Sequence, residues 1–313
     1  MALRSLFGLT CMLLVSMPTV AQELEPRLFA NTPAGVNFFA VGYGHSSGNV
    51  LLDPTLPIED LDANIHLTFV RYTRTVDFFG LSSKVMALLP FSGADWEGSI
   101  VDGSGALGSV FGTGRQERHV TGFGDARFTW AVNFVGSPAL RPREFGEYRQ
   151  RTIVGAIVQV VAPTGQYDAD KLLNLSSNRW VLRPQVGVSR AVGRWTLEGA
   201  ASVLLFADNN DFFGGMRLSQ EPLYTVQGHA IYGFRPGVWL GIGMAYGRGG
   251  TTRVNGVIRN TKLSTYRIGG TFAYAITPRH GLSVGFTSGV RAKAGADFDS
   301  IGCAYQYMWG GGS

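Results

Sequence analysis

The chain is poor in charge and cysteine, and it has no long apolar run after its N-terminus. Only 16% of its 313 residues are charged, against a usual value of about 25%, and two are cysteines. Without about 18 consecutive apolar residues a helical membrane protein is excluded. A net charge of +5 with 45% hydrophobic residues excludes a disordered chain. The lack of a dense lysine and arginine run argues against nucleic acid as a partner.

Glycine and aromatic residues, in contrast, are abundant. The chain has 43 glycines, and 12% of its residues are aromatic. So much glycine and so many rings with so little charge are unusual for a soluble enzyme. The composition favours an all-β protein, either soluble or embedded in a membrane as a barrel.

Residues 1–21 have the features of a secretory signal peptide. Arg4 supplies the positive charge, an apolar core covers 6–15, and small residues at 19–21 suit cleavage. Residues 22–34 are then expected to form a periplasmic segment, and 35–313 the barrel. Export also removes Cys11, so Cys303 has no partner for an internal disulfide. The folded chain must then be stabilised in another way, for example by a large hydrophobic core or by a closed barrel.

Alternation of apolar and polar residues predicts strands along most of the chain. Between 126 and 134, Phe128, Trp130 and Phe134 fall on one face, while Arg127 and Thr129 fall on the other. The clearest segments are 126–134, 180–189, 195–205, 224–232, 265–274 and 300–309. Weaker candidates are 35–47, 62–73, 78–90, 150–162, 238–248 and 280–289. The sequence therefore predicts about twelve strands, each long enough to cross a bilayer when tilted.

Connection length and the chemistry of the two faces favour a membrane barrel over a packed soluble one. Short connections such as 192–193 and 235–237 alternate with long ones such as 91–121, with 136–149 as the exception. Outer-membrane barrels have short periplasmic turns and long extracellular loops. The apolar face carries the aromatic residues that form membrane-interface girdles, namely Trp130, Trp180, Trp195, Tyr224, Tyr232, Tyr246, Tyr266, Tyr274, Tyr307 and Trp309. We therefore predict an all-β, closed antiparallel transmembrane β-barrel.

The polar face would line a pore. Its predicted lining residues are Lys84, Arg127, Arg183, Gln185, Glu198, Gln227, His229 and Arg267, and His66 is expected to point inward as well. Four cations stand against one carboxylate, and basic rings favour anions. The alternative is an internal polar network that plugs a barrel of this size.

The middle of the chain contains a motif made of Pro163, Gly165, Tyr167, Asp168, Asn174, Asn178, Arg179 and Trp180, followed by Pro184-Gln185-Val186-Gly187. This motif resembles the outer-membrane transporter family named for the MetA pathway of phenol degradation. Gly122-Phe123-Gly124-Asp125 and Leu89-Pro90 fit the same family, and Ser176 stands where the family pattern has glycine. The resemblance implies an outer-membrane channel for small, aromatic or hydrophobic molecules. The motif is expected to hold a loop in place, with Asp168 or Asn174 capping backbone N–H groups.

Two other functions stay open at this point. His45 and Ser47 lie two apart on a predicted strand, a spacing that resembles outer-membrane lipid hydrolases. A barrel without transport would instead have a structural role carried by segment 91–121.

We predict no catalytic activity, metal or cofactor. The expected surroundings are outer-membrane lipid and a small-molecule permeant, without nucleic acid; the sequence leaves the oligomeric state open.

Overall fold

The computed structural model describes residues 24–49, 58–100, 114–171, 173–259, 261–292 and 297–311. The predicted signal peptide and Cys11 lie outside these residues. No α-helix in the described ranges is long or apolar enough to span a bilayer.

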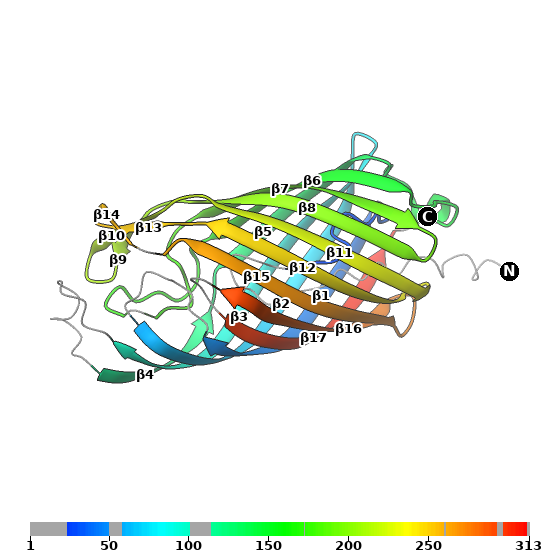
Figure 1. The fold of residues 1–313 in the computed structure, drawn as a ribbon. Coiled ribbons are helices and arrows are strands. Elements are labelled where there is room, and N and C mark those ends of the chain that lie inside the picture. The colour runs from blue at the N-terminus through cyan, green and yellow to red at the C-terminus, as the bar shows by residue number, and fades with distance from the viewer. Residues whose placement is uncertain are drawn as a thin grey trace.

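The chain forms a closed antiparallel β-barrel (Figure 1). Its sheet has 13 strands at twelve positions around the ring, because β4 and β5 both pair with β3 and share one position. The ring closes where β1 pairs with β2 on one side and with β17 on the other. The prediction of about twelve strands is confirmed. The strands are β1 (Val36–Asn49), β2 (Ile58–Phe78), β3 (Leu81–Ile100), β4 (Gly114–Phe123), β5 (Ala126–Val135), β6 (Thr152–Ala162), β7 (Val181–Val192), β8 (Trp195–Phe206), β11 (Leu223–Arg235), β12 (Val238–Gly249), β15 (Leu263–Ala275), β16 (His280–Ala292) and β17 (Asp297–Gly310).

The expected loop 91–121 is largely strand, so that prediction was wrong. β3 runs on to Ile100, and Gly114–Phe123 returns beside it as β4. Side chains alternate along this part of β3, where Ala94 and Trp96 are buried and Phe91 is exposed. The polar residues after Pro90 made this alternation difficult to recognise in the sequence. Residues 101–113 of this segment are outside the described ranges.

The two faces of the wall differ as the alternation predicts. Phe128 is 51% exposed, while Arg127 beside it is 9% exposed. The large apolar side chains therefore point away from the barrel, and the polar ones point into it. A packed soluble barrel would have the opposite arrangement, since its apolar face forms the core.

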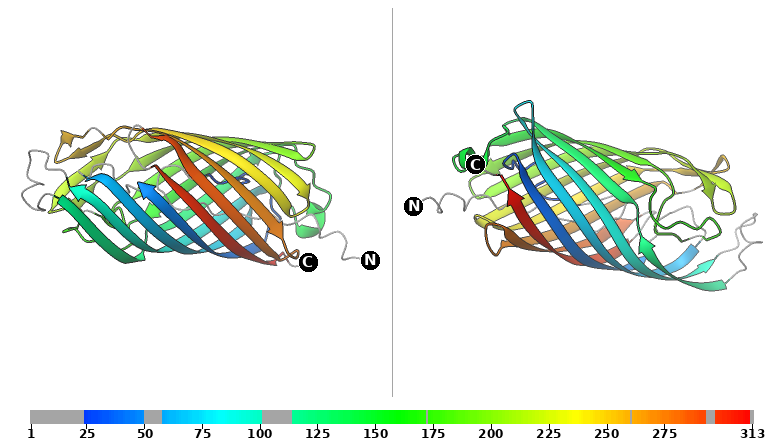
Figure 2. Two further views of the ribbon diagram at one scale, coloured as in Figure 1. Left: turned by 60° about the horizontal axis from the view of Figure 1, so that its bottom comes forward. Right: turned by 180° about the vertical axis from the view of Figure 1, so that it is seen from behind.

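Short turns gather at one end of the barrel, which we call the turn end. They lie at 79–80, 193–194, 236–237 and 276–279, and the short helix α2 (Pro142–Phe145) joins them there (Figure 2). The opposite, loop end carries the longer connections and a second sheet. This sheet consists of β9 (Asn209–Phe212), β10 (Met216–Gln220), β13 (Thr252–Val254) and β14 (Val257–Ile258). A buried cluster including Trp96, Phe212, Phe213, Leu218 and Phe298 packs this sheet against the inner wall.

The segment 163–180, which contains the sequence motif, is anchored by Asp125, the residue directly before β5. Asp125 Oδ1 accepts hydrogen bonds from the Gly165 N–H at 3.0 Å and the Ser176 hydroxyl at 2.6 Å. Its Oδ2 accepts from the Ser177 N–H at 3.0 Å. Gly165 is needed because a Cβ there would lie 2.6 Å from the Gly124 carbonyl carbon. Serine at 176 contributes a hydroxyl to this anchor, and its backbone is not left-handed.

Asn174 shapes the loop itself. Its Oδ1 accepts from the Asp168 N–H at 2.9 Å, and its Nδ2 donates to the carbonyls of Asp168 and Lys171. Asp168 Oδ1 in turn accepts from the Asp170 N–H at 3.0 Å. The side-chain hydrogen bonds of Asp168 and Asn174 thus join backbone groups of their own loop.

Replacing Asp125 should loosen this loop. Asp125→Ala leaves the N–H groups of Gly165 and Ser177 without their acceptor, which should lower the free energy of unfolding by about 1–3 kcal/mol. Protease cleavage within 163–180 should also become faster, as mass spectrometry of the fragments would measure. Asp170→Ala, which changes an exposed carboxylate of the same loop, is the control. Equal cleavage rates in the two variants would contradict the anchoring role.

An arginine on the outer face should destabilise the barrel in a bilayer. Val186, near the middle of β7, is 58% exposed. Val186→Arg should cost about 2–4 kcal/mol if this position lies near the bilayer midplane. Urea unfolding in phospholipid vesicles measures this, with Val186→Leu as the apolar control. An unchanged unfolding midpoint would mean that this face does not contact lipid.

Candidate functional site: the barrel interior

One side of the interior, from β2 to β8, carries most of the buried charge. We call it the charged arc, and it is defined by Arg71, Lys84, Arg127, Arg183 and Glu198, each 9% exposed or less. Gln185, 5% exposed, lies on the same arc. Arg183 Nε donates to the Ser202 hydroxyl at 3.1 Å. Among the buried side chains that the structure describes, six are cationic and one is anionic.

Residues 24–34, here called the N-terminal segment, lie inside the barrel and contact the charged arc. Lys84 Nζ donates to the Ala30 carbonyl at 2.7 Å and to the Leu28 carbonyl at 3.4 Å. Asn133 Nδ2 donates to the Phe29 carbonyl at 3.0 Å. Glu198 accepts from the Arg27 N–H at 2.6 Å and from the Ser189 hydroxyl at 2.9 Å. Lys84 and Glu198, predicted as pore-lining, thus hold a piece of the chain's own backbone.

Phe29 anchors the middle of the N-terminal segment. Its side chain is 2% exposed and packs against Ala131, Ile153 and Ile157. The inner wall makes room for the ring, because a Cβ at Gly187 would lie 2.4 Å from it. The sequence predicted 22–34 as a periplasmic segment preceding the barrel. The place of residues 24–34 in the lumen depends on contacts with strands far along the chain.

Two charged groups of the interior escaped the sequence analysis. Arg71, 6% exposed, shares the inner face of β2 with Leu67 and Phe69. Apolar residues on both faces of this strand obscured its alternation. Glu25 interacts electrostatically with Arg71 and Arg183, but it lies in the N-terminal segment, where no alternation marks it.

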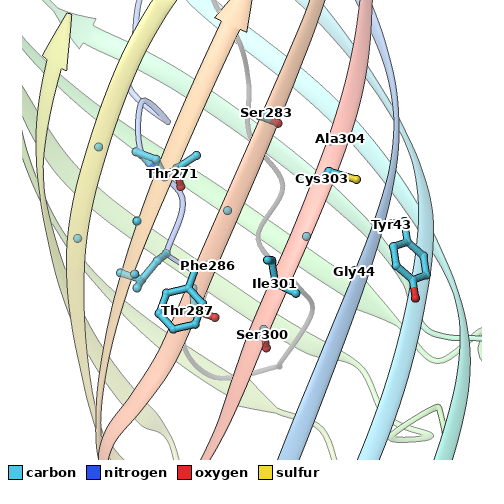
Figure 3. Close-up of a pocket in the computed structure, with 18 of the residues that line it drawn as sticks. Tyr43, Gly44, Thr271, Ser283, Phe286, Thr287, Ser300, Ile301, Cys303 and Ala304 are labelled. Carbon is cyan, nitrogen blue, oxygen red and sulfur yellow. The ribbon is translucent and has the colours of Figure 1, made fainter.

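The opposite side of the interior, over β11, β12, β15, β16, β17 and β1, has few charges. The guanidinium of Arg267 lies 3.8 Å from the centre of the Phe298 ring. His229 is 7% exposed, and Gln227 two residues before it is half-buried. Several glycines lie on this part of the inner face, and a hollow lies against them between β12 and β1 (Figure 3).

His66 was predicted to point inward, and this was wrong. Its side chain is exposed on the outer face of β2, where its Nδ1 lies 2.6 Å from the Tyr43 hydroxyl. The His45 ring lies 4.7 Å from that of His66 on the same outer face. Within the described ranges no hydrogen bond joins Ser47 to His45, whose Nδ1 has no partner. A serine nucleophile needs its base within hydrogen-bond reach, so this pair is not assembled for hydrolysis.

The remaining motif residues connect the motif loop to the loop end of the barrel. The Tyr167 hydroxyl donates to the Asp211 carbonyl at 3.0 Å, and Asn178 Nδ2 donates to Asn209 Oδ1 at 3.1 Å. Asn178 has a φ of 51°, a conformation that asparagine tolerates better than most residues. Arg179 stacks on Phe206 at 4.8 Å, and Trp180 is exposed on the outer face. Pro163 directly follows β6.

No group of three potential metal ligands occurs in the described part of the chain.

Comparison with solved structures places this barrel among known folds. The COG4313 outer membrane channel from Pseudomonas putida F1 is 22% identical, with a TM-score of 0.74 over 92% of this chain and 100% of that one. The transport unit of the autotransporter AIDA-I from Escherichia coli is 8% identical, with a TM-score of 0.50 over 97% and 96%. At these identities the likeness concerns the fold, which is that of an outer-membrane β-barrel. Among curated protein sequences, none matches this chain.

The sequence also matches a family model over most of its length. The family is described as "Putative MetA-pathway of phenol degradation", and the match covers residues 41–305. This range runs from within β1 to within β17 and includes the motif loop with its Asp125 anchor. The resemblance seen in the motif is confirmed. The chain therefore belongs to the family named for the MetA pathway of phenol degradation.

Proposed function

We propose that the protein is an outer-membrane channel through which small molecules pass without an energy source of their own. The observation that carries this proposal is the closed barrel with an apolar outer face and a charged inner face. Lipid would solvate the apolar outer face, and water or a permeant would solvate the charged inner face. The turn end would face the periplasm and the loop end the outside. One similar structure, the COG4313 protein, is itself an outer membrane channel.

The N-terminal segment would be the constriction of this channel. It crosses the lumen at the charged arc, held by Lys84, Asn133 and Glu198. Each of these bonds joins one side chain to one backbone group, so the segment can be released without breaking the barrel wall. Passage would then depend on how often the segment leaves this position.

The charged arc supports a preference for anions. Arg71, Lys84, Arg127 and Arg183 outnumber Glu198 and Glu25 around the constriction. An excess of fixed positive charge lowers the energy of an anion in a narrow pore and raises that of a cation. Carboxylated molecules are therefore suitable guests along this arc.

The channel is favoured over lipid hydrolysis because of where His45 and Ser47 lie. Both belong to the outer face of β1, and the His45 ring packs on His66 instead of meeting the serine hydroxyl. The polar side chains described inside the barrel line a lumen. They do not include a nucleophile placed beside a general base.

Weakening the hold on the N-terminal segment should open the channel. Lys84→Met removes the bonds to the Leu28 and Ala30 carbonyls, so single-channel conductance and the rate of liposome swelling should rise above wild type. Lys171→Met, in the exposed motif loop, is the control. If wild type and Lys84→Met conduct equally, the segment does not limit passage. If neither admits any solute, the channel function itself is wrong.

Ion selectivity tests the charged arc. In a KCl gradient across a planar bilayer, the reversal potential of the wild type should show preference for chloride. The double variant Arg127→Gln, Arg183→Gln should shift it towards potassium, because two buried positive charges are lost. Arg190→Gln changes an exposed arginine at the end of β7 and should leave the potential unchanged. A wild-type channel that prefers potassium would contradict the anion preference.

A further inference from the structure

The exposed charges at the turn end of the barrel are mainly positive. Within the described ranges, nine exposed arginines lie there against three exposed carboxylates, and no exposed lysine joins them. The arginines are Arg74, Arg141, Arg143, Arg149, Arg151, Arg190, Arg194, Arg235 and Arg279, and the carboxylates are those of Asp77, Glu144 and Glu147. This basic surface lies outside the lumen, apart from the charged arc.

Three of these arginines lie at consecutive turns around the ring, which join β7 to β8, β11 to β12 and β15 to β16. Arg194 lies in the first turn, Arg235 is the last residue of β11, and Arg279 lies in the third turn. The Arg194 carbonyl accepts a hydrogen bond from the Gly233 N–H at 2.8 Å, so the first turn lies beside the end of β11. We call Arg194, Arg235 and Arg279 the basic rim.

Aromatic side chains lie on the outer face directly beside the basic rim. Trp195, Phe234 and Tyr274 are each 39% exposed or more, and the ring centre of Tyr232 lies 5.0 Å from those of Trp195 and Phe234. The guanidinium of Arg235 lies 5.5 Å from the centre of the Tyr274 ring, and its Nη2 donates to the Tyr274 hydroxyl at 3.3 Å. Tyrosine and tryptophan rings lie at the boundary between acyl chains and headgroups. The basic rim therefore lies at the level of the headgroups.

The basic rim has no acidic partner in the described part of the chain, in contrast to exposed arginines at the loop end. There Arg217 pairs with Asp208, and Arg253 pairs with Glu221 at 2.7 Å. No described carboxylate forms an ion pair with an arginine of the basic rim. A guanidinium that no carboxylate engages can donate two parallel hydrogen bonds to a phosphate group.

We propose that the basic rim binds the headgroups of anionic phospholipids in the membrane leaflet at the turn end. The inference rests on the proposed function, because it requires a barrel that spans a membrane. The phosphate accepts hydrogen bonds from the guanidinium groups, and the acyl chains contact the aromatic side chains beside them. A zwitterionic headgroup fits less well, because its ammonium group adds positive charge to a surface that already has an excess of it. An acidic protein would engage the arginines but not the rings that face lipid.

Two variants with the same loss of charge test the proposal at opposite ends of the barrel. The rim variant replaces the three cations of the basic rim by glutamine, as Arg194→Gln, Arg235→Gln and Arg279→Gln. The loop-end control replaces three exposed cations there, as Lys171→Gln, Arg217→Gln and Lys262→Gln. A third variant, with lysine at the three rim positions, keeps the charge. Circular dichroism and heat-dependent migration in gels verify that each variant is folded.

The readout is native mass spectrometry of the purified full chain in detergent micelles, titrated with phosphatidylglycerol or with phosphatidylcholine of the same acyl chains. Wild type and the loop-end control should bind phosphatidylglycerol at least about fivefold more tightly than phosphatidylcholine, the contribution of one arginine near an anionic surface. The rim variant should bind both lipids equally, while the lysine variant should keep the preference. Inorganic phosphate, which has no acyl chains, should bind at least about tenfold more weakly than phosphatidylglycerol.

Three results would overturn the proposal. Equal affinity of the wild type for the two lipids would mean that the arginines do not select an anionic lipid, and an acidic protein would then be the partner to test. An equal loss of preference in the rim variant and the loop-end control would mean that total charge alone attracts the lipid. Inorganic phosphate that binds as tightly as phosphatidylglycerol would mean that the site takes a free anion.

Liposome swelling on the same proteins separates the lipid site from the channel function. If wild-type protein conducts solutes but shows no preference for phosphatidylglycerol, the lipid site is wrong and the channel remains. If the lipid preference is found as expected but no solute crosses, the lipid site remains and the channel function is wrong.

Discussion

The backbone hydrogen bonds that close the ring are the constraint on which every other feature depends. β1 lies between β2 and β17, so the ring closes, and every described strand of the wall except β4 is paired on both sides; β4 is paired with β3. Hydrocarbon offers no partner to a free N–H or carbonyl, and only a closed barrel removes such groups from strands. Closure also fixes the register, and the register decides which side chains point to lipid and which to the lumen.

Inside the barrel, other groups of the same chain compensate the free-energy cost of burying charged side chains. Lys84 and Glu198 are bonded to backbone groups of the N-terminal segment, and Glu25 of that segment lies among Arg71 and Arg183. A buried charge is tolerable only when it is paired or hydrogen-bonded. The same contacts that stabilise these charges therefore place 24–34 across the lumen.

The loop end is organised by a different set of interactions. The Asp125 carboxylate gathers hydrogen bonds from the motif loop, and the apolar cluster around Trp96 packs β9 and β10 onto the inner wall. Long connections are thereby tied to the rigid barrel. A permeant would meet defined surfaces along its path, in contrast to the open water channel of a large porin.

Local alternation in the sequence determined the barrel and the direction of most side chains, because a period of two is a property of each strand alone. It placed Lys84, Arg127 and Arg183 inside and Phe128 outside. It failed on β2, where apolar residues occupy both faces, and so missed Arg71 and misplaced His66. Only the tertiary structure decided what depends on strands meeting across the ring, namely the N-terminal segment in the lumen and Asp125 as anchor of the motif loop. Those relations join residues far apart in sequence, and no local pattern records them.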